Sequence, residues 1–165
     1  MRTIGIIGAG RIAKVFARQL LKSGFRVIIS NSRGPSLLAS LVTNLGSEAK
    51  AGTTHQAAQA EIVILAVHWC QVVQALTNLP SWNGRILIDA TNPGIYFSSD
   101  LKVADLGVLT SSEFIARLVP GARLVKAFNT LATKLLKIIL SKHMEGILFL
   151  SPEMMCIPRG FVLIS

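Results

Sequence analysis

The chain begins with a glycine pattern of the kind that binds nucleotide phosphates. Gly8-Ala9-Gly10-Arg11-Ile12-Ala13 reads G-x-G-x-x-A and stands between an apolar run at 3–7 and a helical pattern. The first glycine allows a tight turn, the second lets the backbone approach a pyrophosphate, and the small alanine permits close helix-to-strand packing. The start of such a helix also offers unpaired N–H groups and the positive end of its dipole to an anion. The pattern predicts a dinucleotide-binding turn, with a purely structural turn as the alternative.

Polar and basic residues follow the second apolar run. A site selective for NAD would place Asp or Glu here, to accept hydrogen bonds from the adenosine ribose hydroxyls. Here the segment instead reads Ser30-Asn31-Ser32-Arg33, without a carboxylate. Amide, hydroxyl and guanidinium donors suit a 2′-phosphate. We therefore expect NADP as the cofactor, and the alternative for Arg33 is an ordinary solvent-exposed loop arginine.

Three more polar residues follow predicted strands. His68 comes after the run 62–67, Asn92 after 85–90 and Asn129 after 123–128. The carboxyl ends of parallel strands form the ligand-binding edge of a doubly wound sheet. The two amides could bind the ribose or the nicotinamide carboxamide there, or equally could cap a loop or the next helix. His68 is interpreted as a cofactor contact rather than a proton donor, and Asp89 as holding a loop rather than acting as a base.

The elements that must position these residues alternate along the chain. Apolar runs predict strands at residues 3–7, 25–30, 49–52, 62–67, 85–90, 123–128 and 146–150. Helical patterns cover residues 11–23 with Gly24 as C-terminal cap, 35–45, a short stretch to 60 with Thr53 or Thr54 as its N-cap, 69–79, a stretch to 118 with Ser111 or Ser112 as its N-cap, and 131–143. We expect a loop at 91–110. This order predicts an α/β, doubly wound Rossmann fold with a mostly parallel sheet, strand order 3-2-1-4-5-6 and a possible extra C-terminal strand.

Composition limits the class of protein. The 165 residues are 51% hydrophobic and 15% charged, as expected for one globular domain over 1–165. The mean hydropathy of +0.55 is high, yet the apolar runs end well before the roughly 20 residues that a spanning helix needs. Neither a membrane span nor a secretion signal is expected. Two cysteines are too few for a disulfide framework, so we expect a cytoplasmic protein.

The net charge of +9 raises the question of an anionic partner. Basic residues are scattered rather than clustered, so we expect no nucleic-acid partner. The densest set is Arg11, Lys14, Arg18 and Lys22, whose spacing places it along one helix face. Such a set is either a solvated face or a surface that steers a phosphate.

Together with the glycine turn, four segments resemble those of a known family. They are 30–35 (SNSRGP), 66–69 (AVHW), 89–93 (DATNP) and 125–130 (VKAFNT). In these residues the chain resembles the NADP-dependent deazaflavin (coenzyme F420) reductases, whose dinucleotide-binding domain is also similar to the cytosolic domain of six-transmembrane metalloreductases. The resemblance runs from Met1 to about Leu150, although relatives often have Pro where this chain has His68.

The resemblance implies an NADP-dependent oxidoreductase that transfers a hydride from NADPH to a deazaflavin or flavin, a small molecule stacked on the nicotinamide. Such a transfer needs two rings held face to face, so no catalytic side chain is assigned. The histidines His55, His68 and His143 lie far apart and form no zinc spacing with Cys70 and Cys156. The expected cofactor contacts are Gly8, Ala9, Gly10, Arg11, Ile12, Asn31, Ser32, Arg33, Ala66, Val67, His68, Asn92 and Asn129.

The resemblance breaks after residue 150. Relatives continue with helices that help wall the substrate pocket, whereas 151–165 is an atypical short apolar tail. An apolar tail needs cover from its own sheet or from a second subunit, so a homodimer is expected. Two alternatives stay open: a non-catalytic NADP-binding sensor or truncated enzyme, and an imine reductase of the pyrroline-5-carboxylate type, which needs a large helical domain that does not fit this length.

Overall fold

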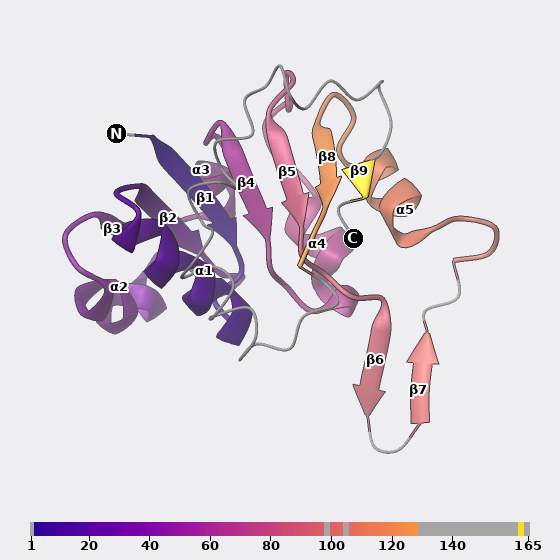
Figure 1. Cartoon of the computed structure of the whole chain (residues 1–165), viewed down its shortest axis with the longest axis horizontal. Helices are drawn as coiled ribbons and strands as arrows, with labels where there is room; N and C mark the ends of the chain where they lie inside the picture. The colour runs from indigo at the N-terminus through magenta and orange to yellow at the C-terminus, as the bar shows by residue number, and fades with distance from the viewer. Residues whose placement is uncertain (1, 98–99, 104–105, 129–161, 164–165) are drawn as a thin grey trace.

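The computed structural model of the chain describes residues 2–97, 100–103, 106–128 and 162–163 (Figure 1). Their centre is a seven-stranded sheet in the order β3-β2-β1-β4-β5-β8-β9, with every pairing parallel. The strands are β1 (Thr3–Ile7), β2 (Arg26–Ser30), β3 (Ala49–Gly52), β4 (Ile62–Leu65), β5 (Ile86–Asp89), β8 (Arg123–Lys126) and β9 (Val162–Leu163). Since β8 is the sixth strand of the predicted series, the predicted order and the doubly wound fold are confirmed.

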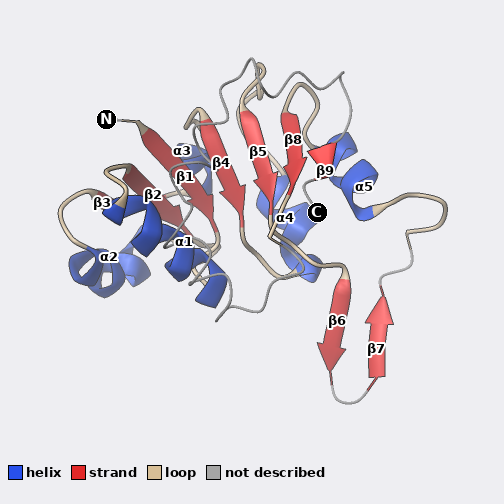
Figure 2. Cartoon of the chain, viewed as in Figure 1, coloured by secondary structure: helices blue, strands red, loops and turns tan. Residues whose placement is uncertain are grey.

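Helices cover both faces of this sheet (Figure 2). The α-helices of the described residues are α1 (Arg11–Lys22), α2 (Ala39–Leu45), α3 (Thr54–Ala58), α4 (Val72–Leu76) and α5 (Ser111–Leu118). Short 3-10 turns, η1 (Pro35–Leu38) and η2 (Trp69–Gln71), precede α2 and α4. Each helix crosses between parallel strands, as a βαβ unit requires.

Several predicted boundaries were too long, for local reasons. The helix predicted over 69–79 ends at Leu76, because Thr77 is extended and its hydroxyl donates to the carbonyl of Val73 at 2.7 Å. The strand predicted over 123–128 ends at Lys126. Phe128 has a φ of 68°, and its ring packs edge-on against Phe16 with 5.1 Å between ring centroids. A left-handed residue cannot continue a strand.

Two helix starts carry reciprocal caps. Thr53 caps α3 with Gln56, and Thr110 caps α5 with Glu113; in each pair the side chains accept from each other's backbone N–H. The prediction of Ser111 or Ser112 as the cap of α5 was therefore wrong. The T-x-x-E spacing of a capping box was present in the sequence and identifies Thr110.

An antiparallel hairpin occupies part of the stretch that was predicted to be a loop. It consists of β6 (Gly94–Phe97) and β7 (Asp100–Val103), and it stands away from the main sheet (Figure 1). The last strand is also a difference, because β9 comes from the segment interpreted as a tail. The helix predicted over 131–143 and the strand predicted over 146–150 lie outside the described residues.

The core has two layers, one on each face of the sheet. One gathers Phe16 and Leu20 of α1 against Ile6 and neighbouring strands, and the other gathers Ile115 of α5 with Leu87. Strands buried on both faces account for the continuous apolar runs in the sequence. Gly5 lets α3 lie directly on β1, since a Cβ there would stand 1.9 Å from the carbonyl oxygen of Ala57.

Candidate functional site

The turn after β1 requires its first glycine, Gly8, for the fold itself, whether or not a ligand binds. Gly8 has a φ of +119°, and a Cβ there would lie 2.2 Å from the carbonyl oxygen of Ala66 at the end of β4. Its N–H donates to the carbonyl of Ser30 at 3.0 Å. Both the left-handed backbone and the close approach exclude other side chains. Gly8 thus brings the ends of β1, β2 and β4 together.

The second glycine has no comparable structural reason. Gly10 has φ −74° and ψ −170°, an extended conformation that any residue adopts, and a Cβ there would meet nothing within 4 Å. It is the N-cap of α1, yet no side chain caps this helix and its first turn holds no acidic residue. The space in front of Gly10 is therefore open, beside N–H groups that need an acceptor. Ala13, by contrast, is fully buried under the helix, as predicted from the pattern.

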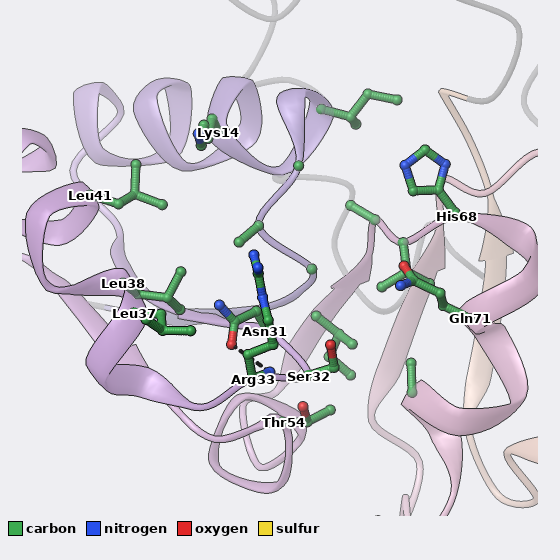
Figure 3. A pocket seen from close by; sticks show the side chains of 18 of the residues that line it. Lys14, Asn31, Ser32, Arg33, Leu37, Leu38, Leu41, Thr54, His68 and Gln71 are labelled. Carbon is green, nitrogen blue, oxygen red and sulfur yellow. Dashed lines mark hydrogen bonds between the residues drawn. The ribbon is translucent and has the colours of Figure 1, made fainter.

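A cavity of about 1360 Å³ opens at the carboxyl ends of β1, β2 and β4 (Figure 3). Of the thirteen predicted cofactor contacts, eleven line it: Gly8, Ala9, Gly10, Arg11, Ile12, Asn31, Ser32, Arg33, Ala66, Val67 and His68. Asn92 is exposed just beyond β5 and is not among the lining residues. Asn129 lies outside the described residues. The fold thus brings three separate stretches of the prediction, residues 8–12, 31–33 and 66–68, to one place.

The loop after β2 presents a guanidinium to this cavity. The N–H of Arg33 donates to Oδ1 of Asn31 at 3.0 Å, which closes a tight turn. Ser30 is fully buried and its hydroxyl donates to the carbonyl of Ile6 at 3.0 Å, so its side chain links β2 to β1 rather than facing the cavity. Figure 3 shows the Arg33 side chain pointing into the cavity. Among the described residues, no carboxylate forms an ion pair with it.

The lining is basic. Arg11, Lys14 and Arg33 contribute cationic side chains, and no Asp or Glu is among the lining residues. Arg18 and Lys22, on the same helix face, do not reach the cavity. The four-residue basic face of α1 is therefore divided: its first half faces the pocket and its second half is exposed elsewhere. Such a pocket attracts an anion from solution.

Sequence reasoning missed an apolar wall and several polar groups. Leu37, Leu38 and Leu41 of η1 and α2 border the cavity close to Arg33, and Leu37 is 60% exposed (Figure 3). The missed polar side chains are Lys14, Ser40, Thr53, Thr54, Gln71 and Gln74. The only signal for the leucines was their helical spacing just after Arg33. That spacing alone does not say which face of α2 meets the cavity.

The opposite wall follows β4. His68 and Gln71 stand across the cavity from Arg33 (Figure 3). The exposed His68 is the N-cap of η2, and its carbonyl accepts from the N–H of Gln71 at 2.9 Å. The predicted helix after this strand therefore starts as a tight 3-10 turn, of which Gln71 lines the cavity together with the N-cap residue His68.

Asp89 holds a loop, as expected. Its carboxylate accepts from the N–H of Thr91 at 2.8 Å and from the Thr91 hydroxyl at 2.7 Å, and it pairs with Nζ of Lys126 at 2.8 Å. Both charged side chains are buried. With every oxygen engaged, this carboxylate is a structural group rather than a base.

The described residues contain neither a metal-binding cluster nor a membrane-spanning helix. No group of three or more His, Cys, Asp or Glu side chains in that part of the chain is arranged to hold a metal ion. Within the same residues, no helix has the length and apolar character needed to cross a membrane.

Comparison with known proteins gives concordant matches. Residues 3–93 match the family described as NADP oxidoreductase, coenzyme F420-dependent. The crystal structure of a hypothetical protein from Sinorhizobium meliloti is 40% identical, with a TM-score of 0.74, over 83% of this chain and 66% of that one. The crystal structure of a putative F420-dependent NADP reductase from Arthrobacter sp. FB24 is 26% identical, with a TM-score of 0.71, over 82% and 65%.

A curated relative is larger. Metalloreductase STEAP3 of Rattus norvegicus is 30% identical over 135 residues, which are 78% of this chain and 25% of the relative. The chain thus spans about a quarter of the length of the curated relatives that it matches.

Proposed function

The chain belongs to the family of coenzyme F420-dependent NADP oxidoreductases, and we propose that it binds NADPH and passes a hydride to a deazaflavin or flavin acceptor. The observation that carries this proposal is the open space over Gly10 at the uncapped start of α1. A glycine that the protein does not need for its own packing, at a helix start without an anion of its own, fits the close approach of a pyrophosphate.

The residues around the cavity fit the rest of this cofactor. Arg33, beside Asn31 and Ser32, would hold the 2′-phosphate, because a guanidinium binds phosphate oxygens in a forked geometry. The leucines of η1 and α2 offer an apolar surface next to it, suited to a flat adenine ring. From there the site continues past Gly10 toward Ala66, Val67 and His68 at the end of β4.

In the reaction, this chain supplies position rather than acid or base chemistry. Bound NADPH supplies one hydride from its nicotinamide ring, and the acceptor takes up that hydride together with a proton from water. The walls after β4 and β5 would fix the nicotinamide ring so that one face stays open to the acceptor. Holding two rings at contact distance replaces a collision by an oriented pair, which lowers the entropic part of the barrier.

The test is an assay of NADPH oxidation at 340 nm with three acceptors in parallel: a deazaflavin, FMN and a ferric chelate. We expect oxidation with the deazaflavin or FMN and none with the Gly10→Asp variant, which serves as the matched control. Binding without oxidation of NADPH by any acceptor would indicate a sensor and contradict hydride transfer. No binding of NADPH at all would contradict the whole proposal.

We also propose that the chain forms a homodimer. Residues 154–164 are mostly apolar, and Val162–Leu163 lie at the outer edge of the described sheet, beside β8. An apolar strand at the edge of a sheet can pair with a strand of a second chain. Light scattering should give twice the chain mass of 17.7 kDa, and a monomer that persists at high concentration would contradict this.

The cytoplasm is the compartment we propose. Cys70 is exposed and forms no disulfide with any described residue, which suits a reducing environment. Fractionation of the native cells should place the protein with cytosolic markers, and recovery with secreted proteins would contradict this.

A further inference from the structure

Two charged residues face each other where β5 and β8 end. Asp89 and Lys126 are the last residues of their strands and are paired in register. Nζ of Lys126 lies 2.8 Å from Oδ2 of Asp89, and the two side chains are 7% and 0% exposed. The residues two positions earlier on each strand, Leu87 and Leu124, belong to the apolar layer of the same sheet face. The ion pair therefore takes positions that apolar side chains could fill.

The pair is tied to the segment that follows β5. Oδ1 of Asp89 accepts from both the N–H and the hydroxyl of Thr91, at 2.8 and 2.7 Å. Nζ of Lys126 also donates to the carbonyl of Thr91 at 2.6 Å. Thr91 is thus held through three of its polar groups and is itself 2% exposed. The backbone of Ala90 is fixed as well, since its N–H donates to the carbonyl of Leu65 at 3.1 Å.

A buried ion-pair network of this kind adds little to the free energy of unfolding, but it restricts the backbone that it binds to one conformation. Taking two charges out of water costs free energy that their attraction only partly returns, and apolar replacements of similar size are often as stable. Hydrogen bonds between charged groups, however, specify direction as well as distance. The network therefore fixes the path of the chain after β5 more firmly than side-chain packing alone would.

That path borders the cavity. Ala90, between Asp89 and Thr91, is one of its lining residues. Arg33 and Gly10 belong to the part of the site over β1 and β2, whereas Ala90 lies beyond β4. In a doubly wound sheet the dinucleotide extends across the carboxyl ends of the strands through the crevice where the strand order reverses. With the 2′-phosphate near Arg33, the nicotinamide half extends toward Ala90.

We propose that Asp89 and Lys126 are positioning residues for the nicotinamide half of the cofactor. They hold the backbone of Ala90 and Thr91 in the position where it would contact the nicotinamide ring. This rests on the proposed function. It assigns the buried pair to a task that neither Arg33 nor the glycine turn can perform. Replacing its members should loosen the nicotinamide end and leave the adenosine end intact.

The experiment compares two ligands on the full chain by calorimetry. The fragment 2′,5′-ADP reports on the adenosine half, whereas NADPH reports on both halves. Two variants disturb the network: Lys126→Met, which removes the cation, and Thr91→Val, which removes one hydroxyl and leaves both charges paired. Arg85→Met is the matched control. Arg85 precedes β5 at its other end, where its guanidinium donates to the carbonyls of Pro80 and Ser81.

We expect both network variants to weaken NADPH binding by about three- to tenfold, the scale of one or two lost hydrogen bonds, and to change 2′,5′-ADP binding by less than about twofold. In the oxidation assay, kcat should fall by on the order of ten- to a hundredfold, because a misplaced ring is out of reach of the acceptor. Arg85→Met should change neither ligand's affinity.

The outcomes separate two failures. A wild-type chain that binds neither ligand would overturn the proposed function itself. A wild-type chain that binds both, with network variants that lose both ligands equally or neither, would overturn only the positioning role. Circular dichroism and thermal unfolding establish that each variant is folded. Should Lys126→Met fail to fold because Asp89 is left buried without a partner, Thr91→Val alone decides.

Discussion

The N–H of Arg33 donates to the Oδ1 of Asn31 at 3.0 Å, so the side chain two residues earlier fixes the turn that carries the guanidinium. A cation on a fixed turn loses less conformational entropy on binding than one on a loose loop. The relationship gives Asn31 a task in preparing the site in addition to any direct contact with a ligand.

Replacement of Arg33 by alanine should reduce affinity for the phosphorylated cofactor selectively. One charge-assisted contact at a partly exposed site is worth about 1.5–3 kcal/mol, so we expect NADPH binding to weaken by at least about tenfold and NADH binding by less than about threefold. Raising the salt concentration should reduce the wild-type preference for NADPH over NADH, because salt screens the contact between Arg33 and the 2′-phosphate. Calorimetry with both cofactors checks this. Equal losses for both would show that Arg33 supports the loop, and a wild-type preference for NADH would overturn the NADP assignment.

Lys14 and Arg18 provide a matched pair on one helix face. Lys14 lines the cavity and Arg18 does not. We expect Lys14→Gln to weaken NADPH binding by about three- to tenfold and to flatten its salt dependence, while Arg18→Gln changes affinity by less than about twofold. Titrations at three salt concentrations provide the measurement. Similar effects of both substitutions would indicate that the overall positive charge of the protein, rather than a contact of Lys14 in the pocket, attracts NADPH.

The two glycines of the turn should respond differently. Gly10→Asp should leave circular dichroism and thermal unfolding close to wild type and should abolish NADPH binding, because its carboxylate would occupy and repel the place of the pyrophosphate. Gly8→Ala should instead lower the free energy of unfolding by about 1–3 kcal/mol or more, from left-handed strain and overlap with Ala66. Affinity of the Gly10→Asp variant within a few fold of wild type would remove this turn from the site.

Glu113 should make stability depend on pH. The pKa of the Glu113 carboxyl is held below its usual range, chiefly by a hydrogen bond from the N–H of Thr110 at 2.7 Å and secondly by one from the Thr110 hydroxyl at 2.9 Å. A lowered pKa in the folded state adds stability above the usual pKa of a glutamate, and this is lost as the pH falls through the folded value. In Glu113→Gln the amide oxygen can still accept from Thr110 but does not titrate.

Thermal unfolding over a series of pH values measures this. The Tm of the wild type should exceed that of Glu113→Gln at neutral pH, and the difference should shrink in acid. Thr110→Ala, which removes the cap, should lower the Tm throughout. A gap between wild type and Glu113→Gln that stays constant with pH would mean that the carboxylate is not what stabilises the start of α5.

The strand order could be predicted from the sequence, and so could the sheet edge at which the cavity opens, because both depend on local patterns. Apolar runs identify strands that are buried on both faces, and the first βα turn locates the ligand-binding edge. What failed depends on packing between elements. Whether Lys14 or Arg18 faces the cavity is decided by how α1 lies across the sheet, and the contribution of Leu41 is decided by the tilt of α2. The hairpin was missed because its apolar run, 95–97, is only three residues long.

The difference between Gly8 and Gly10 also matters for protein engineering. In a library randomised at both positions and selected only for folding, position 8 would return glycine, because neither the backbone angle nor the nearby carbonyl accepts a side chain. Position 10 would return many residue types. A second round, sorted for retention on an immobilised nucleotide, would remove nearly all of them. Residue types that are accepted at position 10 in the first round and lost in the second would show that this position is constrained by ligand binding and not by folding.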